Sequence, residues 1–91
     1  MTKAIALETL KNSHLVAPWT NDQGEIWNFQ IGELFAETQE CFIFVVYPHS
    51  TKAPIDPDYA FLFDVMKDNS AVVRSDSPVT EDELREAKKN L

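Results

Sequence analysis

The chain has 91 residues, of which 44% are hydrophobic and 25% are charged, and its formal net charge is −7. This length predicts a single domain over residues 1–91 with one hydrophobic core, because so short a chain cannot bury two. The composition excludes a disordered chain, and the negative charge argues against direct binding to nucleic acid or to anionic membranes.

The N-terminal quarter predicts one helix and one short edge segment. Residues 3–12 favour a helix for which Thr2 is a suitable N-cap. Its apolar side is expected to consist of Ile5, Leu7 and Leu10. Residues 14–19 are expected to be extended at a sheet edge, because Pro18 has no N–H for a strand ladder. The polar residues 20–24 predict a turn.

The middle of the chain predicts two neighbouring strands. From Glu25 onward, apolar and polar residues alternate, which is typical of a half-buried strand. The residues of its apolar face are Trp27, Phe29 and Ile31. Gly32 interrupts the alternation, and we expect residues 33–37 to continue the strand past a bulge. After a turn at 38–40, residues 41–48 are apolar on both faces, which predicts an interior strand.

Residues 49–58 form a long polar connection with two prolines, and long loops often carry function. Residues 59–66 predict a strand, because three of the first five side chains are aromatic. An Asp-Pro pair leaves a helix over 57–67 as the alternative. The polar residues 67–70 and the apolar run that starts at Ala71 predict the turn and second strand of a hairpin.

The last predicted element is a C-terminal helix. Thr80 and Glu83 have the spacing of a capping box, with acids in the first turn and lysines in the last. The fold class predicted from these elements is α+β: a four- to five-stranded, mainly antiparallel sheet with an N-terminal helix and a capped C-terminal helix packed on one face.

Residues capable of metal binding are few. Cys41, His14 and His49 have none of the spacings of known metal sites, so we expect no metal and no cofactor. Cys41 is expected to be a small core residue, and as the only cysteine it cannot form an intramolecular disulfide. We therefore expect a cytoplasmic protein, and no apolar run predicts a signal peptide or a membrane span.

The sequence also argues against an enzyme. A nucleophile and base could be drawn from Ser50 or Thr51 with His49 and one of Asp56 or Asp58. Neighbouring residues on a flexible loop rarely reach the geometry that catalysis needs, and no glycine-rich loop supplies an oxyanion site. Asp64 interrupts an apolar run, so it either points to solvent or is a buried acid with a specific partner.

The distribution of charge suggests a function. Residues 12–66 hold eight acids against one base, Lys52, so this segment carries the whole excess of negative charge. The leading hypothesis is a small acidic, non-enzymatic protein-binding module, such as an inhibitor, an immunity-type protein or an accessory subunit, that docks on a basic protein surface. Its expected binding residues are Trp19, Asp22, Glu25, Trp27, Glu33, Glu37 and Glu40. The alternative is that these acids only keep the protein solvated.

Two further functions stay open at this stage. One is a small enzyme or ligand-binding domain that uses the 49–58 loop. Its expected residues are His49, Asp56, Asp58 and Tyr59. The other is a homodimer that pairs through an exposed edge strand.

Overall fold

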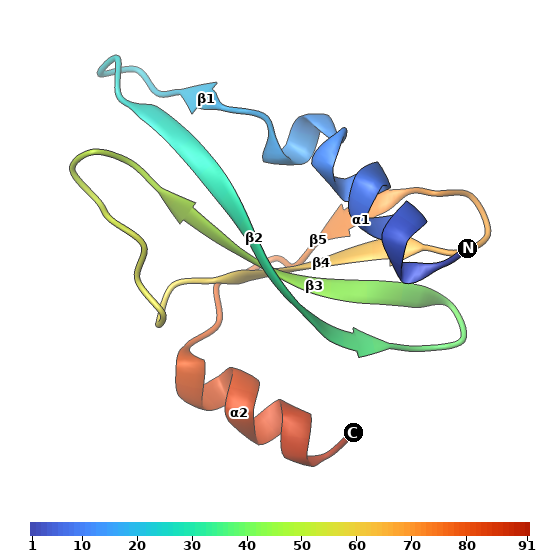
Figure 1. Ribbon diagram of the computed structural model, residues 1–91. Coiled ribbons are helices and arrows are strands. Elements are labelled where there is room, and N and C mark those ends of the chain that lie inside the picture. The colour runs from blue at the N-terminus through green and yellow to red at the C-terminus, as the bar shows by residue number, and fades with distance from the viewer.

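A computed structural model describes residues 1–91 as a curled, five-stranded antiparallel sheet with a helix near each end of the chain (Figure 1). Helices account for 23% of the residues and strands for 37%, so the fold is α+β, as the sequence predicts. The strands lie side by side in chain order, from β1 to β5. The elements are α1 (Lys3–Lys11), the 3-10 helix η1 (His14–Val16), β1 (Trp19–Thr20), β2 (Ile26–Glu37), β3 (Cys41–His49), β4 (Phe61–Met66), β5 (Val72–Arg74) and α2 (Glu81–Lys89).

The first helix begins where the sequence predicts it. Thr2 caps α1, since its Oγ1 accepts a hydrogen bond from the Ile5 N–H at 3.2 Å. The fully buried residues of α1 are Ala6 and Leu10, whereas Ile5 is 55% exposed. The prediction that Ile5 belongs to the apolar side is therefore wrong. The small Ala6 side chain lets the helix approach the sheet along the line of Ala6 and Leu10, which turns Ile5 outward.

The segment 14–19 is extended only at its end, so that prediction needs correction. Ser13 accepts a hydrogen bond from the Leu15 N–H at 3.2 Å and starts a 3-10 turn. Leu15 and Val16 then pack against the core beneath α1. The 3-10 turn is more stable here than an extended segment, because it places the side chains of Leu15 and Val16 against the sheet. Within this segment only Trp19, the first residue of β1, pairs with β2, and it does so at the sheet edge, as expected.

The strand β2 continues through Gly32 to residue 37, as predicted. Its register against β3 shifts on both sides of Leu34, which is the expected irregularity. A Cβ atom at Gly32 would lie 3.0 Å from the ring of Tyr47 and 3.2 Å from the carbonyl oxygen of Val45. Glycine therefore permits the close approach of β2 to β3 at the bend.

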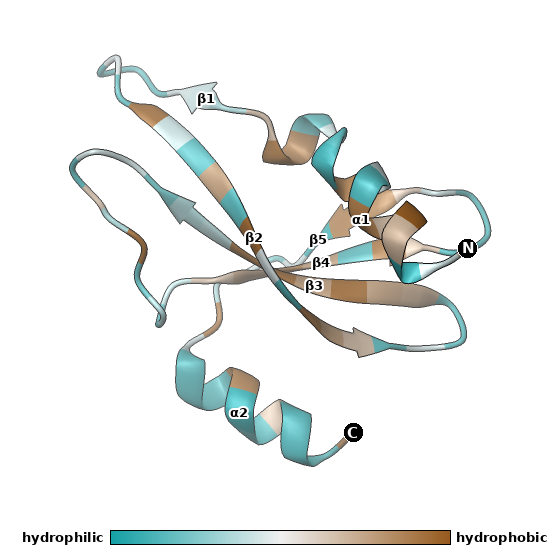
Figure 2. Ribbon diagram, in the orientation of Figure 1, coloured by the Kyte–Doolittle hydropathy of each residue, from teal (hydrophilic) through white to brown (hydrophobic).

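The central strand β3 is buried on both faces, as its apolar sequence predicts, and each face has its own core. Figure 2 shows the hydrophobic stretch of this strand in brown. The face toward α1 holds the larger core, made of Ala6, Leu10, Phe42, Phe44, Val46, Phe63 and Val65. The face toward α2 holds the smaller core, made of Phe35, Val45 and Ala60. The two helices thus cover opposite faces of the sheet, and we call these the α1 face and the α2 face.

The C-terminal third completes the sheet and adds α2. Residues 61–66 are a strand paired with β3, so the helical alternative for 57–67 is wrong. In the predicted capping box, Thr80 Oγ1 accepts from the Glu83 N–H at 3.1 Å and Glu83 Oε1 accepts from the Thr80 N–H at 3.2 Å. Only Leu84 of α2 is even half-buried, so this helix adds little to the core. Neither helix combines the length and the apolar composition needed to span a membrane.

Candidate functional site: an aromatic hollow

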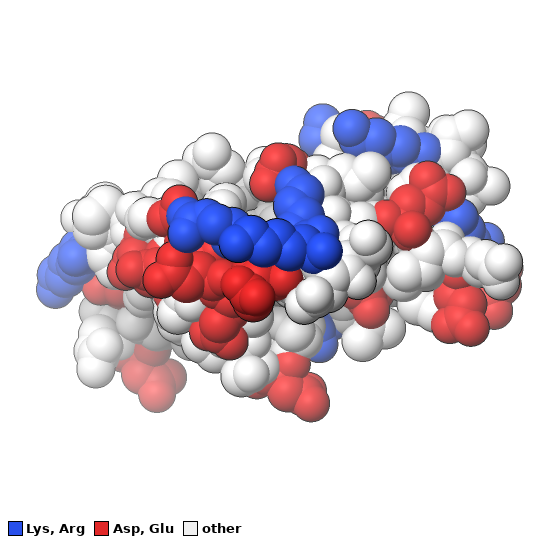
Figure 3. All heavy atoms as spheres, turned by 90° about the horizontal axis from the view of Figure 1, so that it is seen from below, with Lys and Arg blue, Asp and Glu red and all other residues white.

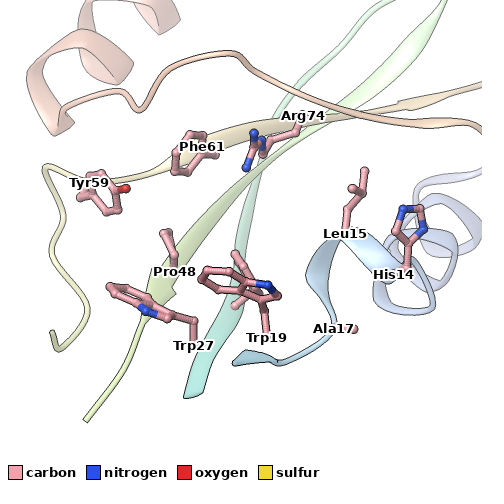
Figure 4. A pocket seen from close by; sticks show the side chains of 10 residues that line it. His14, Leu15, Ala17, Trp19, Trp27, Pro48, Tyr59, Phe61 and Arg74 are labelled. Carbon is pink, nitrogen blue, oxygen red and sulfur yellow. The ribbon is translucent and has the colours of Figure 1, made fainter. Parts of the chain in front are cut away.

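One end of the α1 face is hollowed. The opening has a volume of about 520 Å³, and we call it the aromatic hollow (Figure 4). Seven of its ten lining residues are hydrophobic. They are His14, Leu15, Ala17, Trp19, Trp27, Phe29, Pro48, Tyr59, Phe61 and Arg74. This volume falls within the range of about 300–1,000 Å³ that is usual for ligand pockets.

The β1–β2 hairpin supplies the lower wall in Figure 4, where the two indoles lie side by side. Trp19 and Trp27 are directly paired across the hairpin, so both project from the same face. The side chain of Asn21 fixes the turn, because its Oδ1 accepts from the N–H groups of Gln23 at 3.0 Å and Glu25 at 2.9 Å. Trp27 is half-buried, whereas Trp19 is 58% exposed. An indole so exposed adds little to folding and is free to contact a partner.

The opposite wall comes from β4, β5 and Tyr59, which lies two residues before β4. The rings of Tyr59 and Phe61 meet edge to face, with centroids 5.6 Å apart. The guanidinium carbon of Arg74 lies 5.2 Å from the centroid of Phe61, a cation–π contact. Figure 4 shows this guanidinium pointing into the space between the two walls. Strand alternation explains the position, because Arg74 pairs with the inward-facing Phe63.

A second hollow of about 530 Å³ adjoins the first and shares Trp27, Pro48 and Tyr59 with it. Its other lining residues belong to the long loop after β3. This loop is tied to the β1–β2 hairpin, because the hydroxyl of Ser50 donates to Glu25 Oε1 at 3.0 Å. Ser50 is only 6% exposed, so this hydrogen bond is shielded and fixes the loop beside the indoles.

The structure brings together only some of the seven residues expected to form a docking surface. Asp22 lies in the turn between the two tryptophans' strands, and Glu25 lies at the end of that turn. Glu37 and Glu40 lie at the other end of β2, a strand of 12 residues that at about 3.3 Å per residue spans roughly 40 Å. Glu33 lies between these two groups, so the seven residues are spread along the length of β2 and do not form one continuous surface.

Two of the distant acids are also neutralised by ion pairs. Glu37 binds the Lys67 ammonium at 2.7 Å, and Glu33 binds that of Lys88 at 3.4 Å. Figure 3 shows the side of the molecule that carries α2, where Lys and Arg side chains lie across Asp and Glu side chains. The expected excess of negative charge on residues 12–66 is thus partly balanced by residues from later in the sequence.

The four residues of the alternative loop site are likewise separated. Tyr59 lines both hollows, and Asp56 lines the second. Asp58 accepts a hydrogen bond from the Glu81 N–H at 3.1 Å and so helps to hold the start of α2. His49 follows Pro48 on β3 and faces away from both hollows, because successive strand residues alternate between faces. A serine–histidine pair is not assembled either, since Ser50 is bound to Glu25.

Asp64 is half-buried on the α2 face, between Ile43 and Val73 on the neighbouring strands. Desolvation by burial raises its pKa above the ordinary value of 3.8. The folded state therefore binds this proton more tightly than the unfolded state. The resulting stability is fully present below pH 3.8 and is lost as the pH rises through the raised pKa.

Replacing Asp64 with asparagine is expected to raise the free energy of unfolding at pH 7, because asparagine carries no charge to desolvate. We expect a gain of less than about 1 kcal/mol, since the site is only half-buried. The gain should vanish below pH 3.8, where aspartate is protonated in both states. Urea denaturation at several pH values measures it, with the exposed Asp22→Asn as control. A gain that persists at low pH would contradict the electrostatic explanation.

Several residues of the aromatic hollow are not among those the sequence predicts for a site. Pro48, Phe61 and Arg74 come from three different strands, and only the strand register places them beside Trp27. His14 and Leu15 join them because η1 replaces an extended segment. Comparison of the chain with family models, curated proteins and solved structures gave no match.

Proposed function

We propose that this protein is a small non-enzymatic binding module, of the inhibitor, immunity-type or accessory-subunit kind, that docks on a basic protein surface. The aromatic hollow is the apolar centre of the proposed interface, and the basic residues of the partner face the acids around it rather than Arg74. The observation that carries the proposal is the exposed indole of Trp19 beside Trp27 at the mouth of an open, mostly apolar hollow.

The composition of the hollow supports this function. Residues that dominate binding energies at protein interfaces are enriched in tryptophan, tyrosine and arginine, and they cluster at the centre of the contact. The hollow combines Trp19, Trp27, Tyr59 and Arg74. Three large apolar side chains are exposed in or beside the two hollows, at Trp19, Ile55 and Tyr59. A partner that covers them would remove this surface from water.

The acids nearest the hollow supply the proposed charge complementarity. Asp22 lies at the tip of the hairpin that carries the two indoles, and Asp56 lines the second hollow. Both side chains are exposed, and neither forms an ion pair. Such rim charges chiefly speed association with a partner of opposite charge and suppress association with a partner of like charge. We also infer a cytoplasmic location, because the single cysteine is buried and unpaired.

Affinity capture from native cell extract, with the purified protein as bait, supplies the partner for the test. A partner of the proposed kind is retained at low salt and released at high salt. We then expect Asp22→Lys to weaken its affinity by roughly 2- to 5-fold at low ionic strength, because the substitution reverses a rim charge. The difference should shrink as salt is added, and isothermal titration calorimetry measures it.

Glu40→Lys is the matched control for this experiment. Glu40 is likewise an exposed acid in a turn, but it lies at the far end of the sheet from the hollow. Its reversal changes the net charge by the same amount and should leave the affinity within about 2-fold. The proposal fails if the two variants behave alike, or if binding of the captured protein does not depend on salt.

A further inference from the structure

The inside of the aromatic hollow has the opposite charge to the rest of the protein. The chain carries 15 acids and eight bases, yet no aspartate or glutamate lines the hollow. Arg74 is its only lining residue that is always charged. The arginine is therefore the permanently charged side chain that a ligand inside the hollow would contact directly.

Arg74 has no acidic partner within the protein. The other arginine, Arg85, binds Glu81 at 3.3 Å and Asp82 at 2.8 Å, whereas Arg74 forms no ion pair and its guanidinium makes no hydrogen bond. Its contact with the ring of Phe61 orients the guanidinium but uses none of its N–H donors. The five N–H groups are therefore available to a ligand.

The chemistry of the two walls defines that ligand. A guanidinium in this position matches the two oxygens of a carboxylate, which it can bind through two parallel hydrogen bonds. The indoles of Trp19 and Trp27 and the ring of Tyr59 offer faces and edges against which a flat apolar group can pack. We propose that the aromatic hollow binds a small planar organic molecule with one carboxylate, which lies on Arg74 while its ring lies between the aromatic walls.

Two other ligand classes fit less well. A phosphate ester carries more charge and usually binds several donors, but the hollow offers a single arginine with no lysine and no α-helix N-terminus. A cationic ligand would suit the aromatic rings, but Arg74 would repel it.

Binding of a small carboxylate in the hollow requires no protein partner. A ligand bound there would cover the indoles, so ligand binding and partner docking would exclude each other.

Three probes that share one ring system test the proposal on the purified full chain. Indole-3-acetate carries a carboxylate, indole-3-acetamide is its neutral analogue, and tryptamine is cationic. The indole N–H signals of Trp19 and Trp27 in nitrogen-15 NMR spectra report binding, and a Phe variant at each position assigns them. We expect indole-3-acetate to bind roughly 5- to 10-fold more tightly than the acetamide, and tryptamine to bind most weakly.

Arg74→Gln should reduce the affinity for indole-3-acetate to that for the acetamide, while the acetamide affinity changes by less than about 2-fold. Arg85→Gln is the matched control and should change neither, because Arg85 lies on α2, away from the hollow. Thermal unfolding checks that both variants are folded. Arg74→Lys is a second variant, which keeps the positive charge but loses the planar guanidinium that binds both carboxylate oxygens. Absence of binding, equal affinity for the three probes, or a preference that survives in Arg74→Gln would overturn the proposal. None of these outcomes bears on whether a basic protein partner exists.

Discussion

Replacing Phe63 with alanine is expected to lower the free energy of unfolding by about 3–5 kcal/mol. Phe63 is 0% exposed and lies on β4 in the larger core. It is paired with Phe44 on one side and with Arg74 on the other. Alanine would remove the ring and leave a cavity that the neighbouring strands cannot fill, because both are held in register.

The loss is large for this protein, since a domain of about 90 residues has a total stability of roughly 5–14 kcal/mol. Urea denaturation followed by circular dichroism measures it. Val73→Ala is the control, because Val73 lies on the adjacent strand, is 52% exposed and faces the other way. We expect the control to cost less than about 1 kcal/mol. Similar losses of stability for the two variants would mean that Phe63 does not belong to the core.

The sheet could be predicted from local patterns because each pattern has a direct physical cause. A strand that is apolar on both faces, such as residues 41–48, is stable only where both faces are covered, so its central position follows from its composition. Thr80 and Glu83 identify the start of α2 because the capping box involves only residues three apart. The bulge at Gly32 follows from a break in an otherwise regular alternation.

The aromatic hollow could be predicted only in part, because it depends on contacts between distant residues. The exposed tryptophans are visible in the sequence, but Arg74 joins them only through the register of three successive strand pairs. The balance of charge could not be predicted from the sequence for the same reason. Glu33 and Lys88 are 55 residues apart, so counting acids along residues 12–66 overstates the free negative charge.

The exposed indole of Trp19 is expected to contribute much of the affinity for the protein partner. Trp19→Ala should weaken this affinity by at least about 30-fold, equivalent to roughly 2 kcal/mol. A truncated indole at the centre of an interface loses its contact area and lets water reach its neighbours. Folding should be affected much less, because Trp19 is 58% exposed and lies on an edge strand of two residues. Thermal unfolding and calorimetry with the captured partner measure the two effects separately.

Ile26→Ala provides the matched control for Trp19→Ala. Ile26 belongs to the same hairpin and is 55% exposed, but it precedes Trp27 and therefore faces away from the hollow. If the hollow is the interface, the isoleucine variant keeps the wild-type affinity and only the tryptophan variant loses it. Equal losses of affinity would show that partner binding requires the folded hairpin and not the face that carries the indoles. An unchanged affinity in both variants would locate the partner elsewhere, and the distant acids Glu37 and Glu40 would then be the next residues to replace.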